Sequence, residues 1–288
     1  MIVSRSQRWR ERRDSFVPCS SVVDVSTLSV DVIDCHRVAK PFVEAHHYSG
    51  SFPASRLSVG LFRNGTGGTS DLVGVATFSQ PMNNASVPFH AGLDDHLQGV
   101  DLGRLVLLDD VAGNGETWFL SRAMKALRRE RPNVLSVVSY ADPMTRRAPD
   151  GSLVKPGHVG QVYAVMGAAY RGRTKPRFET VTPDGQLFSE RAMTKIRNGE
   201  TGRAYAIAQL VAKGAPDPCG RDGRAWLEDL RAKGFLSRRR HNGNHVYVFE
   251  MTRAARMAAR GLSRLPYPVI DRNETLDDVT ALPLLMAA

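Results

Sequence analysis

The order of the apolar segments is the feature of this sequence that most restricts its fold. Alternating or β-branched apolar runs predict strands, whereas apolar residues three and four positions apart predict helices. Up to residue 190 these patterns follow one another as strand, helix, three strands, helix, strand, helix and two strands. Three consecutive strands followed by alternating helices and strands predict an α/β fold with a mixed central sheet and flanking helices.

The predicted elements of this region have definite places in the chain. We expect strands at 28–34, 56–62, 72–79, 102–108 and 134–142, and helices at 36–48, 116–130 and 158–170. Two further strands flank Pro183-Asp184-Gly185, a sequence typical of a hairpin turn. Residues 80–99 and 143–157 are expected to form loops.

Beyond residue 190 the pattern changes. AYAIAQLVAKGA and DGRAWLEDLRAKGF predict two short helices, and LSRRRHNGNHVYVFE predicts a hairpin across Asn242-Gly243. Two helices and a hairpin resemble a small winged-helix unit, whose wing would carry Arg238, Arg239, Arg240 and His245. A small appendage packed on the sheet is the alternative interpretation.

The net charge of +10 indicates a polyanionic partner, because phosphate contacts release counterions. The basic residues cluster at Arg5–Arg13, Arg122–Arg131 and Arg231–Arg240. We therefore expect double-stranded DNA as a partner, although an arginine-rich composition also arises in GC-rich genomes. Three cysteines without metal-ligand spacing favour a reduced, cytoplasmic protein. No apolar run predicts a membrane helix, and the N-terminus lacks the pattern of a signal peptide.

Small residues separate the strand at 102–108 from the helix that follows. Unpaired amides at a helix start, together with the helix dipole, favour a phosphate group. Gly113 and Gly115 let the backbone approach a ligand closely, and an ordinary turn is the alternative. The candidate cofactor-binding residues are Val111, Ala112, Gly113, Asn114, Gly115, Glu116 and Thr117.

This strand, loop and helix resemble the GNAT N-acyltransferase family, which binds the coenzyme A pyrophosphate after its fourth strand. VAGNGET has glycines but lacks the leading Gln or Arg of that family's usual loop. Further segments occur in a distinctive order: HHYSGSFPAS (46–55), LVGVATFSQP (72–81), LGRLVLLDD and NGETWFLSRAMKAL (within 102–127), SYAD (139–142) and GHVGQVYAVMGAAYRG (157–172). Over residues 28–190, their order and spacing resemble the phage Mom family of DNA-modification proteins, a divergent GNAT branch.

The resemblance implies a transferase that adds a carbamoylmethyl group to adenine N6 and protects phage DNA from restriction in the host cytoplasm. It implies acetyl-CoA or a related acyl-CoA as cofactor; the sequence leaves the need for a metal and the oligomeric state open. The expected organisation is a basic arm at 1–27, a GNAT-like catalytic domain at 28–190, a DNA-contacting appendage at 191–263 and a loose tail at 264–288.

An acyltransferase must hold a thioester and an amine, remove a proton and stabilise the developing charge. His47 is a candidate base, since its reference pKa is about 6.5, or it caps a helix C-terminus. Tyr48 is a candidate donor to the thiolate or a ring that stacks on a base. Asp142, at the end of a buried strand, is placed to orient His47, accept a proton or cap the following loop.

The GNAT resemblance implies Tyr163 as the acid that protonates the leaving thiolate, with core packing as the alternative. The candidate substrate-binding residues are Ser49, Arg104, Tyr140, Arg238, Arg239 and Arg240. His158 is placed either to cap a helix or to join His47 and Asp142 at a metal. Two other functions fit the sequence: an acetyltransferase for an amine of another base, a protein or a small molecule, and a non-enzymatic DNA-binding regulator.

Overall fold

The computed structural model describes residues 5–10, 13–18, 22–65, 68–147, 150–155 and 157–268. Contacts divide the chain into two compact units. Unit 1 comprises the described residues up to Thr145, then Val154–Thr174, then those from Asn244 onward. Unit 2 comprises Arg146–Leu153 and Lys175–Gly243. Cys19, and most of the tail expected from residue 264, lie outside the described residues.

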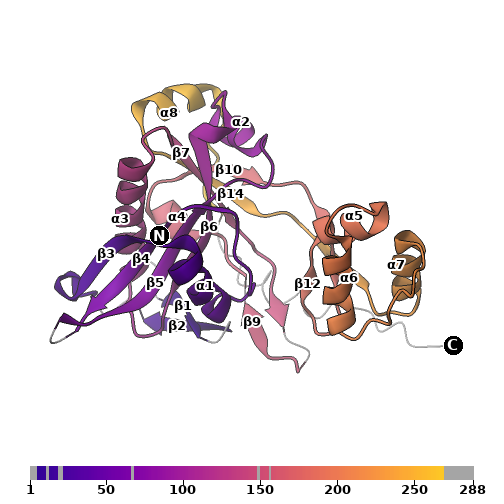
Figure 1. Cartoon of the computed structure of the whole chain (residues 1–288). Coiled ribbons are helices and arrows are strands. Elements are labelled where there is room, and N and C mark those ends of the chain that lie inside the picture. The colour runs from indigo at the N-terminus through magenta and orange to yellow at the C-terminus, as the bar shows by residue number, and fades with distance from the viewer. Residues whose placement is uncertain are drawn as a thin grey trace. The chain divides into compact units, whose positions relative to one another are not determined.

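A seven-stranded sheet forms the centre of unit 1 (Figure 1). Its strands, in spatial order, are β10 (Ala169–Arg173), β14 (His245–Glu250), β7 (Ser136–Ala141), β6 (Gly99–Leu107), β5 (Ser70–Ser79), β4 (Ser55–Asn64) and β3 (Leu28–Ile33). All neighbours are antiparallel except β6 and β7, which are parallel. The predicted α/β class with a mixed central sheet is therefore confirmed.

The parallel pair is short. β6 and β7 are matched at Gly99 with Ser136, at Val100 with Val137 and at Asp101 with Val138. Beyond Asp101, β6 continues to Leu107 with only β5 as its partner, and β7 continues to Ala141 with only β14. The facing edges of the two strands therefore carry peptide groups that do not pair with each other past this point.

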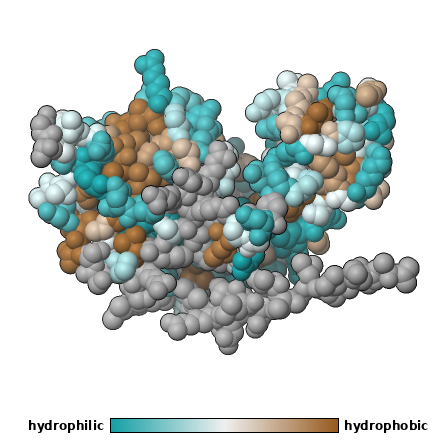
Figure 2. Space-filling model, turned by 90° about the horizontal axis from the view of Figure 1, so that it is seen from below, coloured by the Kyte–Doolittle hydropathy of each residue, from teal (hydrophilic) through white to brown (hydrophobic). Residues whose placement is uncertain are grey.

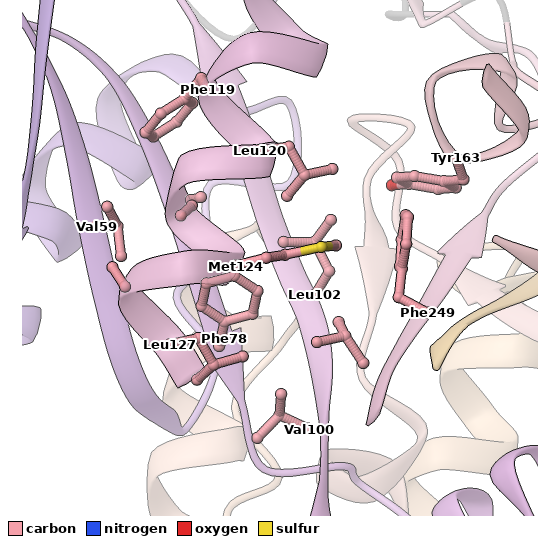
Figure 3. Close-up of a cluster of buried hydrophobic side chains, with 14 of the residues drawn as sticks. Val59, Phe78, Val100, Leu102, Phe119, Leu120, Met124, Leu127, Tyr163 and Phe249 are labelled. Carbon is pink, nitrogen blue, oxygen red and sulfur yellow. The ribbon is translucent and has the colours of Figure 1, made fainter. Parts of the chain in front are cut away.

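Helices cover both faces of this sheet. Helix α3 (Gly115–Glu130) places Phe119, Leu120, Met124 and Leu127 against the sheet residues Val59, Phe78, Val100 and Leu102 (Figure 3). Helix α4 (Gln161–Val165) adds Tyr163 on the same side. The opposite face is covered by α1 (Lys40–His46), which follows a π-helical turn at Cys35–Ala39, and by α2 (Ser86–Ala91).

The N-terminal segment is more ordered than the sequence suggested. Strands β1 (Arg5–Arg10) and β2 (Arg13–Pro18) pair as an antiparallel hairpin, so the expected irregular arm is wrong for these residues. Arg8 is fully buried and is thus unavailable to a DNA backbone. At the other end, the Tyr267 hydroxyl donates to the carbonyl of Ala168 at 2.9 Å, and the Leu265 amide donates to the carbonyl of Tyr170 at 3.0 Å. The start of the expected loose tail is therefore attached to unit 1.

Unit 2 has its own sheet and core. Strands β12 (Leu187–Phe188), β11 (Arg177–Val181) and β13 (Ser237–His241) form an antiparallel sheet in that order. Helices α5 (Glu190–Asn198), α6 (Arg203–Ala212) and α7 (Gly223–Ala232) pack around Trp226, Met193 and Leu210. Outside the two main sheets, β8 (Arg146–Arg147) pairs with β9 (Leu153–Lys155). Helix α8 (Arg253–Ala258) follows β14 in unit 1. No helix in the described residues is long and apolar enough to cross a membrane.

Four local predictions are wrong. The loop expected at 80–99 contains α2, and the loop expected at 143–157 contains the paired strands β8 and β9. The helix expected at 158–170 spans only α4, because Gly160 and Gly167 adopt φ values of 81° and 79°, and β10 follows. The hairpin across Asn242-Gly243 does not form, because β13 and β14 belong to different sheets. The apolar β14 is buried between two neighbours, whereas the arginine-rich β13 suits a more exposed sheet.

Candidate active site

Four elements of unit 1 bring polar side chains together. The end of α1 supplies His47 and Tyr48, and the end of β7 supplies Asp142. Lys155, the last residue of β9, lies with its ammonium 3.0 Å from Asp142 Oδ2 and 5.1 Å from the centre of the Tyr48 ring. Tyr48 also raises the pKa of Tyr163, so these two hydroxyls are close. The four predicted catalytic residues thus lie near one another, together with a lysine.

The hydrogen bonds of His47 fix which ring nitrogen carries a proton. Its Nδ1 atom accepts from the backbone amide of Ser49 at 3.2 Å and lies 2.8 Å from Ser49 Oγ. A backbone N–H can only donate, so Nδ1 carries no proton and the neutral ring is protonated at Nε2. His47 therefore presents an N–H donor at Nε2, an arrangement that suits charge stabilisation better than proton removal.

Asp142 uses both carboxylate oxygens within the protein. Oδ1 accepts from the backbone amide of Met144 at 2.9 Å, which caps the loop after β7. Oδ2 forms the ion pair with Lys155, whose ammonium also donates to the carbonyl of Asp142 at 2.9 Å. Lys155 is fully buried and Asp142 is nearly so. The pair thus fixes the end of β7 relative to β9.

His158 lies beside this ion pair. Its backbone amide donates to the carbonyl of Asp142 at 2.9 Å. Burial, reinforced by the Lys155 ammonium, lowers the pKa of His158 to about 3, so its imidazole is neutral at physiological pH. Among the described residues, no three His, Cys, Asp or Glu side chains form a group suited to hold a metal ion.

Tyr163 belongs to the apolar core as well as to the site. Its ring packs against Phe249 and Tyr247, with centroids 6.1 and 5.4 Å away, and it faces α3 across the core (Figure 3). Burial raises the pKa of its hydroxyl above the ordinary value, with Tyr48 adding to the effect. The hydroxyl therefore stays protonated and is suited to donate a proton.

Two predicted substrate-binding residues organise neighbouring segments. Arg104 donates to the carbonyl of Ser51 at 3.1 Å and to its hydroxyl at 2.9 Å, which fixes the segment after α1. Tyr140 lies with its hydroxyl 2.5 Å from Ser86 Oγ at the start of α2. Burial raises the pKa of Tyr140 to about 12, with a contribution from Asp101.

The N-terminal hairpin holds the predicted cofactor loop. The Arg8 guanidinium donates to the carbonyls of Val111 at 2.9 Å and Ala112 at 2.6 Å, and it forms an ion pair with Glu116. A Cβ atom on Gly115 would lie 2.7 Å from a methyl group of Val111, so this glycine is required for packing within the loop itself. The Thr117 hydroxyl, in the first turn of α3, donates to the carbonyl of Asn114 at 3.2 Å.

The three consecutive arginines of β13 differ in their surroundings. Arg239 donates to the buried carboxylate of Glu179 at 2.8 Å. Arg238 and Arg240 are exposed on the other side of the strand, and the Arg238 guanidinium lies 4.2 Å from the centre of the half-exposed Phe178 ring. Arg240 is paired with Phe178 across the sheet. Two arginines and an aromatic ring thus share one exposed face.

Sequence reasoning missed Lys155 and the role of Arg8. Lys155 stands in a segment that reads as a loop, between a short apolar pair and Pro156, and nothing in that pattern marks it as buried. Arg8 is one of several arginines in a basic segment. For both residues the partner is distant in the chain, so the local sequence carries little signal.

Two comparisons with known proteins bear on this site. The model of the Mom protein family matches residues 27–269. A curated relative, methylcarbamoylase mom of Escherichia phage Mu, is 30% identical over 182 residues, which cover 63% of this chain and 68% of the relative. The family match includes the central sheet, His47, Tyr48, Asp142, Lys155 and Tyr163. The chain therefore belongs to the Mom protein family.

Proposed function

We propose that this protein modifies DNA by adding a carbamoylmethyl group to the N6 amine of adenine, with a coenzyme A thioester as cofactor. The observation that carries the proposal is the family membership, together with the relative named a methylcarbamoylase. The cluster of His47, Tyr48, Asp142, Lys155 and Tyr163 supplies a buried polar site of the kind that group transfer requires.

We also propose a GNAT-like fold for unit 1. β6 is the fourth strand of the central sheet in chain order, and the loop at 108–114 with the start of α3 follows it directly. In the GNAT family, which this segment resembles, the coenzyme A pyrophosphate binds at the corresponding position. The ladder between β6 and β7 ends early, so beyond Asp101 the two strands do not pair with each other, and an extended ligand placed between them would find peptide groups to bond.

The charges around the loop at 108–114 are compatible with a bound diphosphate. Helix α3 has 16 residues, and the positive end of its dipole lies at Gly115. Glu116 in the first turn would repel an anion, but the Arg8 guanidinium neutralises it. Acyl transfer from a coenzyme A thioester bound there would give an N-acyl adenine. A carbamoylmethyl group requires a bond from N6 to a methylene carbon, so its donor must carry the carbamoyl group and a leaving group on that carbon.

The chain's own residues then have separate tasks. Tyr163, kept protonated by burial, donates a proton to a leaving thiolate. His47 offers its Nε2–H to negative charge that develops during transfer. Asp142 and Lys155 hold the end of β7 and the Tyr48 ring in place. Since adenine N6 is stacked and paired within a duplex, the base must be flipped out to reach them.

DNA binding is supported by charge. Unit 2 contains 16 Lys and Arg against 9 Asp and Glu. The side chains of this unit visible in Figure 2 are largely hydrophilic, with smaller apolar areas between them. Arg238 and Arg240 are free to contact phosphates, with Phe178 beside them for apolar contact with the nucleic acid.

The decisive experiment is nucleoside mass spectrometry of plasmid DNA from cells that express the protein. The proposal predicts a new deoxyadenosine derivative with the mass of a carbamoylmethyl group, absent from cells that express His47→Ala with Asp142→Ala. An acetylated amine on another base, a protein or a small molecule would instead favour the alternative function as an acetyltransferase. Unmodified DNA that the protein still binds with a steep salt dependence would favour the regulator.

A further inference from the structure

Asp101 occupies the point at which the central sheet opens. It is the last residue of β6 that is matched with β7, opposite Val138, and it is paired with Ser79 of β5 on its other side. Paired residues share a face of the sheet. Val138 packs with Val87 and Ala91 of α2, so the Asp101 side chain lies on the face that α1 and α2 cover.

The Asp101 carboxylate has an unusual environment. Its Oδ1 atom is buried and has no hydrogen-bond partner in the part of the chain that the structure describes. Burial raises the pKa of Asp101 from 3.8 to about 7. A buried acceptor without a partner costs folding free energy, and such groups gather at functional sites.

Aromatic and basic side chains lie on the elements around Asp101. Tyr140 of β7 is its close neighbour, and the Tyr140 hydroxyl is already bonded to Ser86 of α2. His90 of α2 lies with its ring centre 6.3 Å from that of Tyr140. Arg104, farther along β6, directs its guanidinium to Ser51. Tyr140, His90 and Arg104 are titratable or charged groups of β7, α2 and β6, and in the described part of the chain none of them donates a hydrogen bond to Asp101 Oδ1.

We infer that Asp101 accepts a hydrogen bond from the exocyclic amino group of the target base, with the Tyr140 ring beside it, and that it thereby selects an amine as substrate. This inference rests on the proposed function. In a duplex the adenine amino group donates to the paired base, and flipping removes that acceptor. Asp101 supplies a new one.

An exocyclic amine has two N–H bonds, and only one is replaced during the transfer. The other persists and stays bonded to Asp101, which orients the nitrogen toward the cofactor throughout the reaction. An ionised carboxylate is a stronger acceptor than a neutral amide of the same shape. Asp101→Asn therefore keeps the shape and one acceptor oxygen but weakens the interaction.

The test compares Asp101→Asn with the wild type and with Asp71→Asn, an exposed acid on β5. Modified adenine is measured by mass spectrometry in co-expressed plasmid, and Tm is measured at pH 8 on the purified full chain. We expect Asp101→Asn to reduce modified adenine at least about tenfold. We expect its Tm to be equal or higher, because it removes a buried charge without a partner.

A loss of activity together with a lower Tm assigns Asp101 a structural role and overturns the inference, as does full activity of Asp101→Asn. Modification of other bases by the variant, but not by the wild type, supports the role in selection. If the wild type itself produces no modified adenine, the proposed function fails instead. Asp71→Asn is expected to match the wild type in both measurements.

Discussion

Lys155 binds Asp142 through two separate groups: its ammonium lies 3.0 Å from the carboxylate Oδ2 and 2.9 Å from the main-chain carbonyl of the same residue. Asp142 directly follows the buried β7, and Lys155 is the last residue of the short β9. The same ammonium lies over the Tyr48 ring. One buried cation thus fixes three segments around the candidate active site.

Removal of this cation is expected to cost stability. Lys155→Met leaves the Asp142 carboxylate buried without a counter-charge, which should lower the free energy of unfolding by about 3–5 kcal/mol. Adding Asp142→Asn should recover part of the loss, because the unpaired charge disappears. Denaturant unfolding of both single variants and the double variant gives the coupling free energy. Strictly additive effects would contradict a direct ion pair.

Arg8 is expected to matter for the cofactor as well as for folding. Arg8→Met leaves the negative charge of Glu116 uncompensated beside the proposed diphosphate site. Coenzyme A binding, measured by isothermal titration calorimetry, should weaken about tenfold or more. Arg8→Met with Glu116→Gln should recover much of the affinity. An unchanged dissociation constant in Arg8→Met would place the diphosphate elsewhere.

The three arginines of β13 are expected to behave differently. Arg238→Ala and Arg240→Ala should each reduce the slope of log K against log salt for duplex DNA by about one unit, and leave Tm nearly unchanged. Arg239→Ala should instead lower Tm, because Glu179 then loses its hydrogen bond from Arg239. Electrophoretic retardation at several salt concentrations, with thermal unfolding of the same samples, separates these outcomes. Equal effects of all three substitutions on DNA binding would contradict this assignment.

The lowered pKa of Glu179 predicts how the stability of unit 2 changes at acidic pH. Burial opposes ionisation of this carboxylate, but the hydrogen bond from Arg239 and the neighbouring His241, Arg146 and Arg177 outweigh it, so the pKa lies below the ordinary 4.5. A lowered pKa contributes stability above pH 4.5 that is lost as the pH falls through the folded-state value. Glu179→Gln should therefore show a flatter dependence of stability on pH below 4.5.

Trp226 provides the measurement for this prediction. It is fully buried in unit 2, and the other tryptophans, Trp9 and Trp118, lie in unit 1. Replacing those two with Phe lets Trp226 fluorescence report on unit 2 alone. Parallel pH profiles for the wild type and Glu179→Gln would contradict the prediction.

Local patterns predicted five of the seven strands of the central sheet well, because their apolar side chains face helices. β3, β4, β5, β6 and β7 all lie within a few residues of their predicted positions. The hairpin at 236–250 was wrong for a tertiary reason. Asn242-Gly243 favours a tight turn locally, but the apolar β14 is buried between β7 and β10 in the central sheet and does not pair with β13.

The site was predictable only in part. His47, Tyr48 and Asp142 stand at the ends of predicted elements, where ligands collect in open α/β sheets. Lys155 and Arg8 act through partners 13 and 108 residues away, Asp142 and Glu116, and no local pattern connects such pairs. Asp101 was missed because the predicted strand begins at residue 102, and nothing in the local pattern marks this acid as part of the strand.

The placement of β14 has a consequence for how the chain folds during its synthesis. This strand is an interior member of the main sheet, yet it is synthesised after all of unit 2. Until the ribosome has released residue 250, β7 and β10 have no partner along their inner edges, and the rings of Tyr247 and Phe249 are missing from the core. In nascent chains these strand edges thus stay unpaired and prone to aggregation until late in translation. Unit 2 is complete before β14 is synthesised, so it has time to fold first.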